Sequence, residues 1–410
     1  SYFRGRISNH WRGIPMSMRA GLAVLIGAYV LSQFFRAFLA VLAPILNTEI
    51  GVTPEDLSNA NGWWFIAFAL SQLPVGWALD KIGPRRTTAV LLIFGGGGGA
   101  LLFASATGQL HIQISMILIG IGCSSVLMAS FFIIARAYSA AMFATLGGLT
   151  IGIGSIGNIA ASLPLAVAVE TFGWRATMVG LAAITTLVAL AVLIIVRDPE
   201  TPDDANQKGS LLDLLKMPAI WLMLPILLFT YAPGAGIRGS WIGPYLSDIF
   251  GQDALGIGRA SLIMGLAMIA SSLLYGPLDR IFKTRKWVVV VANIITITAL
   301  FTLAAFPITS LVTNVALLAI VGVGVGTFSI IMAHGRAFVP PHLLGRGVTL
   351  FNLCSIGGAG VMQMISSWRY EALVASGATP AASYSGIFLL FGIAVLVGTI
   401  VYLAVQDRVD

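Results

Sequence analysis

Long apolar runs separated by short polar segments divide the whole chain. We find twelve such runs, at residues 20–46, 58–79, 87–106, 112–135, 143–168, 174–196, 218–247, 258–278, 287–306, 311–335, 345–368 and 382–406. An α-helix needs about 20 mostly apolar residues to cross the hydrocarbon core of a bilayer, and each run is about that long. The pattern therefore predicts an all-α membrane protein with twelve transmembrane helices.

The longest polar interruption lies between the sixth and seventh runs. It gives an N-terminal six-helix half (1–196), a cytoplasmic linker (197–216) and a C-terminal six-helix half (217–410). The halves also repeat each other at an offset of 200 residues, as the pairs Pro44 and Pro244, Gly76 and Gly276, and Arg136 and Arg336 show. Parallel repeats of this kind form transporters, with a pseudo-twofold axis between the halves and a substrate site near the midplane.

Composition supports a membrane protein. Apolar residues make up 58% of the chain and charged residues only 10%, with a mean hydropathy of +0.93, whereas a soluble domain is about a quarter charged. The net charge of +7 comes from basic residues in short loops between apolar runs, which excludes nucleic acid as a partner. We expect a monomeric transporter in a lipid bilayer, with no enzymatic activity and no cofactor.

Lysine and arginine also predict the orientation. If the N-terminus is cytoplasmic, 18 of the 23 basic residues fall in cytoplasmic segments, while Arg175, Arg259 and Arg369 fall outside. Cytoplasmic loops of membrane proteins carry such an excess. Both termini are therefore expected in the cytoplasm.

The loop after the second run carries a motif, Gly76-Trp-Ala-Leu-Asp-Lys-Ile-Gly-Pro-Arg-Arg86. The glycine permits close helix approach, the aspartate can cap or pair, and Gly-Pro favours a tight turn. A degenerate copy follows the eighth run, at Gly276–Lys286.

These two loops resemble the signature loop of the major facilitator superfamily. The resemblance covers the whole chain and implies a secondary active transporter that works by alternating access in the bacterial inner membrane. It assigns a gating role to residues at the cytoplasmic helix ends: Gly76, Asp80, Arg85, Arg86, Arg136, Asp279, Arg280 and Arg336.

Two arginines fall well inside apolar runs. Arg36 lies in the first run and Arg238 in the seventh, at similar depth in the two halves, and no Asp or Glu lies well inside any run. A buried arginine costs several kcal/mol unless something pairs with it. Backbone carbonyls or amides such as Asn59 and Asn61 could pair with it, or an anionic substrate could.

The guanidinium fork matches carboxylate and phosphate oxygens, so the second alternative predicts a small carboxylate- or phosphate-like substrate. Anion exchangers of the superfamily resemble this chain in placing arginines in helices 1 and 7. Further candidate cavity residues are Gln33, Tyr29, Tyr231, Trp241, Asn158 and Asn352. The lack of a membrane-embedded carboxylate favours anion exchange or uniport over carboxylate-driven proton symport.

Two other transport functions stay open. Met264 and Met268 share a helix face and, with His334, could form part of a copper path, because thioethers favour Cu(I). Parts of the chain resemble a bacterial branch that includes copper importers, although helix 7 lacks that branch's methionine pair. Drug efflux is the second alternative, but the acidic cavity residue it would use is missing.

Overall fold

The computed structural model describes residues 16–138, 140–199, 214–340 and 344–408. The first six membrane helices are α2 (Met16–Phe34) with α3 (Leu39–Ile50), α4 (Pro54–Lys81), α5 (Pro84–Leu91) with η1 (Leu92–Gly97) and α6 (Gly98–Ala104), α7 (Gln109–Cys123) with α8 (Val126–Ala137), α9 (Ala140–Gly154) with α10 (Ile156–Ala160) and α11 (Leu163–Phe172), and α12 (Trp174–Ile195). The last six are α14 (Pro218–Thr230) with α15 (Ala232–Gly236), η2 (Ile237–Trp241) and α16 (Ile242–Phe250), α17 (Ala254–Phe282), α18 (Lys286–Ala305), α19 (Leu311–Gly324) with α20 (Thr327–Arg336), α21 (Leu344–Ala375), and α22 (Pro380–Tyr402).

The twelve-helix prediction is confirmed. Within the described residues, nine helical segments are long and apolar enough to cross a membrane, and two bent pairs bring the number to eleven. The remaining long helix is α21, with 32 residues. Most of the predicted linker, residues 200–213, lies outside the described residues.

Several helices begin earlier than their apolar runs, because polar residues cap them. Helix α4 begins at Pro54 rather than residue 58, since Thr53 and Asp56 form a capping box. Helix α17 begins at Ala254, where Asp253 accepts a hydrogen bond from the Gly256 N–H (2.8 Å). A cap satisfies backbone donors that would otherwise lack partners, so the helix extends past the apolar stretch.

Two of the twelve predicted spans are bent. The first span bends by 49° between α2 and α3, and the fifth by 42° between α10 and α11. Helix 7 stays continuous but contains a π-helical turn, η2. Helices 1, 5 and 7 therefore all lose regular α-geometry near mid-span.

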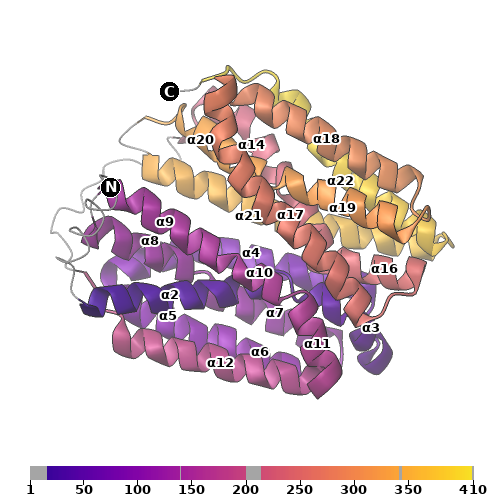
Figure 1. Cartoon of the computed structure of the whole chain (residues 1–410), viewed down its shortest axis with the longest axis horizontal. Helices are drawn as coiled ribbons and strands as arrows, with labels where there is room; N and C mark the ends of the chain where they lie inside the picture. The colour runs from indigo at the N-terminus through magenta and orange to yellow at the C-terminus, as the bar shows by residue number, and fades with distance from the viewer. Residues whose placement is uncertain (1–15, 139, 200–213, 341–343, 409–410) are drawn as a thin grey trace, which may run out of the picture.

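The bundle has two ends, which we name by their residues. The terminal face carries Lys81, Arg136, Asp198 and Asp407, and the opposite face carries Gly51, Gly173, Gly251 and Gly377. Figure 1 shows α2 beginning and the C-terminal segment ending on the same side of the molecule, as twelve spans require.

The two halves pack together toward the opposite face. Ser58 on α4 donates a hydrogen bond to the Gln363 carbonyl on α21 (3.1 Å), and Ser367 donates to the Glu55 carbonyl (2.7 Å). A Cβ on Gly243 of α16 would fall on the backbone of Ala40 in α3. The described structure is therefore the state that is closed at the opposite face.

Carboxylates tie the terminal face together within each half. Asp198, after the sixth helix, accepts a hydrogen bond from the Arg85 N–H (2.8 Å) at the start of α5. Asp407, after the twelfth, accepts hydrogen bonds from the Lys286 N–H (3.1 Å) and the Thr284 hydroxyl (2.5 Å) at the start of α18. The same device thus recurs in both repeats, and the sequence pattern did not predict it.

The Asp407 cap should make stability depend on pH. Partial burial raises the pKa of this carboxyl, but hydrogen bonds from Thr284 and from the Lys286 and Arg285 N–H groups outweigh it and hold the pKa below its usual value. Such a group stabilises the fold above its unfolded pKa of about 4, and the contribution is lost as pH falls through the lower folded pKa. Asp407→Ala should therefore cost about 1 kcal/mol at neutral pH and progressively less in acid.

Melting temperatures of both proteins measured across the acidic and neutral range check this expectation. Glu170→Gln serves as the control, because Glu170 is exposed and forms no hydrogen bond with another described residue. An Asp407→Ala deficit that stays constant down to acid pH would contradict the capping role.

Candidate functional site

Both intramembrane arginines lie where a helix is irregular. Arg36 lies in the break between α2 and α3, where the Ala37 N–H bonds to the Phe34 carbonyl (3.1 Å) in place of the α-helical partner one residue earlier. Arg238 lies in the π-helical turn η2. Breaks and π-turns recur at functional sites, because they redirect side chains and free backbone groups.

Each side-chain nitrogen of Arg238 donates a hydrogen bond in this state. The residue is 2% exposed and donates to the Asn158 side-chain oxygen (3.0 Å) and main-chain carbonyl (2.5 Å) and to the Ser261 carbonyl (3.3 Å). Asn158 lies in α10, in the other half of the molecule. For Arg238 the structure thus supports pairing with amide and carbonyl oxygens, and the two bonds to Asn158 join the two halves.

Arg36 has a different environment. Its side chain is half-buried, and the guanidinium carbon lies 4.9 Å from the centre of the Phe68 ring and 5.4 Å from that of Trp64. Its Nε is buried and has no hydrogen-bond partner within the described residues. Aromatic faces attract the cation, and the side chain also interacts with Tyr231 by a hydrogen bond, which leaves the Nε donor available.

More unpaired polar atoms surround Arg36. The Trp64 indole N–H and both polar atoms of Asn61 are buried, with no partner among the described residues. Gly239 of η2 brings this group together, since a Cβ there would lie 2.5 Å from the Asn61 Nδ2 and 3.2 Å from the Arg36 carbonyl oxygen. Each unpaired buried group costs about 1–3 kcal/mol, so the arrangement is poised for a polar ligand.

Tyr231 connects the two arginines. It lies within electrostatic reach of both Arg36 and Arg238 and packs against Phe65 and Phe328. The two arginines therefore border one region of the protein interior, and Arg36 has a side-chain nitrogen without a hydrogen-bond partner among the described residues.

The other predicted cavity residues have separate surroundings. Gln33 donates to the Tyr29 hydroxyl (2.9 Å), and Tyr29 lies within electrostatic reach of Arg36. The Trp241 indole N–H donates to the Ser366 hydroxyl (2.9 Å) inside the C-terminal half. Asn352 is half-buried on α21 and forms no hydrogen bond within the described part of the chain.

The sequence pattern did not predict Asn61 and Trp64 as substrate-site residues. The sequence suggests Asn61 only as a possible partner for a buried arginine. The sequence gives little indication of a site role for these residues, since a single amide or tryptophan in an apolar run is common.

The residues of the metal alternative are used in packing and hydrogen bonds. His334 Nδ1 lies 2.5 Å from the Tyr402 hydroxyl oxygen, and its Nε2 lies 3.0 Å from the Gln406 carbonyl oxygen. Met264 and Met268 contact Gly322 of α19. Among the described residues, no group of three or more His, Cys, Asp or Glu side chains could hold a metal ion.

The predicted gating residues lie at the terminal face. Asp80 Oδ1 pairs with Arg136 Nη2 at 3.3 Å, and the Arg136 guanidinium lies 3.9 Å from the Phe132 ring centre. Arg86 and Arg336 are exposed, and Arg85 contributes its main-chain N–H to Asp198.

The close approach expected at Gly76 does not occur in this state, because a Cβ there would meet only the Met128 side chain at 3.7 Å. The side chains of Asp279 and Arg280 lie outside the described residues.

Comparison with known proteins points to one family. A model of the Major Facilitator Superfamily matches residues 25–362, and no curated relative matches the sequence. An inward-facing, unoccupied structure of a bacterial homolog to the human lysosomal transporter Spinster is similar over 95% of this chain and 97% of its own, at 18% identity and a TM-score of 0.74.

Two further solved structures have the same fold. The nucleoside transporter NupG is similar over 95% of this chain and 99% of its own, at 16% identity and a TM-score of 0.74. A D-xylose-proton symporter is similar over 92% and 96%, at 15% identity and a TM-score of 0.71. At such identities the likeness extends to the fold and not to the substrate.

Proposed function

The chain belongs to the major facilitator superfamily, and we propose that it moves a small carboxylate- or phosphate-like anion across the bacterial inner membrane by alternating access. The protein is a multi-pass transporter and not an enzyme. The anionic nature of the substrate is the new element of the proposal.

The observation that carries the proposal is the unpaired donor group around Arg36. A half-buried guanidinium whose Nε has no partner lies beside the unpaired Trp64 N–H and the unpaired amide of Asn61. Carboxylate and phosphate oxygens are acceptors that can pair with all of these donors. Arg36 would hold the anion, with Trp64, Asn61 and Tyr231 as neighbours.

Arg238 would take part in a different way. In the described state its donors are bonded to Asn158 and Ser261, so it contributes positive charge to the region but holds no ligand directly. Separation of α10 from η2 and α17 would release it. We propose that it joins the substrate when the halves rearrange.

The distribution of carboxylates supports exchange or uniport. The acidic residues of the chain lie near helix ends or in loops, for example Glu49, Asp80 and Asp248. A proton symporter usually uses a buried carboxylate for its coupling proton. An anion exchanger needs no such group, because the returning anion compensates the arginine charge.

A ligand screen by thermal shift tests the proposal. We expect small carboxylates or phosphate esters to raise the melting temperature of the purified protein, since a ligand at 100 times its Kd stabilises the folded state by about 2.7 kcal/mol. Uridine and D-xylose are suitable neutral controls, chosen because transporters of a nucleoside and of D-xylose share the fold. Stabilisation by a neutral solute or Cu(I), with none by any anion, would contradict the proposal.

The proposed orientation makes a separate prediction. With the terminal face in the cytoplasm, a cysteine at Lys81 should react from the cytoplasmic side only, and a cysteine at Ser376 from the periplasmic side only. Both positions are exposed. The background protein carries Cys123→Ala and Cys354→Ala, and the measurement is labelling by an impermeant maleimide in right-side-out and inside-out vesicles. Labelling of both positions from one side would contradict the helix count.

A further inference from the structure

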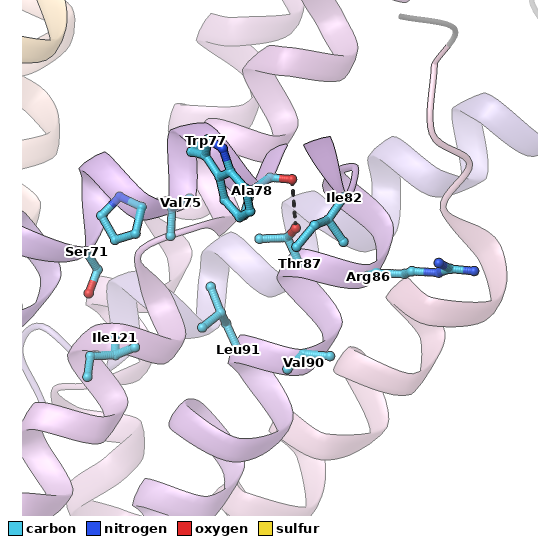
Figure 2. Close-up of a pocket in the computed structure, with 11 residues that line it drawn as sticks. Ser71, Val75, Trp77, Ala78, Ile82, Arg86, Thr87, Val90, Leu91 and Ile121 are labelled. Atoms are coloured by element: carbon cyan, nitrogen blue, oxygen red, sulfur yellow. Dashed lines mark hydrogen bonds between the residues drawn. The ribbon is translucent and has the colours of Figure 1, made fainter. Parts of the chain in front are cut away.

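A groove outside the proposed substrate site opens between α4, α5 and α7, close to the terminal face. Its volume is about 500 Å³, and Trp77, Ile82, Val90, Leu91 and Ile121 are among the residues that line it. Figure 2 shows these side chains around the groove, with Arg86 at one end. Trp77 is 61% exposed and Val90 50%, so the groove opens on the outer surface of the helix bundle.

The length of the groove matches one leaflet of the membrane. It extends along α4 from Ile82, at the terminal face, to Ser71. The eleven-residue separation corresponds to about 16 Å along a helix. Half of a hydrocarbon core of about 30 Å is about 15 Å. The groove thus extends from the membrane surface to roughly the bilayer midplane.

The groove walls offer almost no free polar group. The Ser71 hydroxyl donates to the Ala67 carbonyl (2.7 Å), and the Thr87 hydroxyl donates to the Ala78 carbonyl (3.3 Å), the bond dashed in Figure 2. Arg86 is exposed and forms no hydrogen bond or ion pair with another described residue. The groove therefore combines an apolar slot with a cation, Arg86, that has no partner within the described part of the chain.

We propose that this groove binds an anionic phospholipid, with one acyl chain in the slot and the phosphate at Arg86. Apolar walls suit an acyl chain and give a peptide backbone no hydrogen-bond partners. The guanidinium matches a phosphate, and basic residues between membrane helices near the surface recognise acidic head groups. Trp77 lies at the level where tryptophan prefers the membrane–water interface.

Native mass spectrometry with added lipid tests this site. Wild-type protein should bind phosphatidylglycerol more tightly than phosphatidylcholine of the same chains. Arg86→Gln should weaken phosphatidylglycerol binding about fivefold and leave phosphatidylcholine binding unchanged. Val90→Trp, which fills the slot, should weaken binding of both lipids. The matched controls are Arg336→Gln, at an exposed arginine of the other half, and Ile194→Trp, at an exposed apolar residue of α12.

Three outcomes would overturn the proposal. Equal phosphatidylglycerol affinity in Arg86→Gln and Arg336→Gln would show that Arg86 does not hold the head group. Equal loss in Val90→Trp and Ile194→Trp would show a nonspecific lipid annulus. Full competition by glycerol phosphate, at the same affinity as the lipid, would show an anion site without a chain-binding slot.

Discussion

Replacing Arg36 with alanine is expected to reduce the affinity for an anionic substrate at least about 30-fold. The estimate follows from the loss of a charge-assisted contact in a buried site, which costs about 2–5 kcal/mol. Arg36→Lys keeps the charge but loses the planar fork, so it should still weaken binding about tenfold. Thermal stability should be preserved or improved, because the substitution removes an incompletely paired ion from the membrane interior. Ligand-induced melting shifts and uptake assays measure both effects.

Arg238→Ala should behave differently, and the contrast makes the test specific. It leaves the Asn158 and Ser261 acceptors without their donors, so we expect a lower melting temperature as well as weaker transport. The double variant should add little to the binding defect of Arg36→Ala if both residues serve one ligand. Arg259→Lys is the control, at an exposed arginine near the opposite face.

Wild-type-like anion binding in Arg36→Ala would eliminate the anion proposal. Loss of transport in Met264→Leu and Met268→Leu, with both arginine variants active, would instead favour the metal alternative.

Gly243→Ala is expected to shift the access equilibrium away from the described state. A Cβ at this position would fall on the Ala40 backbone, in the contact between α16 and α3 that closes the opposite face. Forcing a methyl group into such a contact costs about 1–3 kcal/mol. The open form at the opposite face lacks the contact, so its relative population should rise about 5- to 150-fold.

Gly122→Ala provides a matched control, because its Cβ would fall on the Gly96 backbone within the N-terminal half. It should destabilise every state of the cycle and leave their ratio unchanged. Spin labels at Thr107 and Thr309, in opposite-face loops of the two halves, report the ratio through their separation. If Gly243→Ala gives the wild-type distance distribution, the contact does not set the equilibrium.

The sequence predicted the large features well because bilayer thickness and solvation dictate them. The twelve helices follow from apolar length, and the positions of Arg36 and Arg238 follow from their depth in two equivalent runs. The hydrogen-bond partners of the two arginines could not be predicted in the same way. Asn158 lies in α10, just before the bend of helix 5, and no local signal in the sequence marks it as the residue that contacts the other half.

The helix break at Arg36 could not be predicted from the sequence either. Residues 35–38 contain no proline or glycine, the usual causes of a kink. Packing against other helices decides their conformation, and hydropathy does not register that packing. The unpaired atoms of Asn61 and Trp64 became visible only once the whole environment of each group was known.

The Asp198 and Asp407 caps have a mechanical consequence. Each fastens the segment after the last helix of a half to the start of that half's third helix. Such a link between two helix ends resists sliding of helices within a half, and it places no restraint on the interface between the halves. Alternating access can then occur as a rigid-body rotation of the two halves. A ligand that displaces one helix end by a small amount would rotate the whole half.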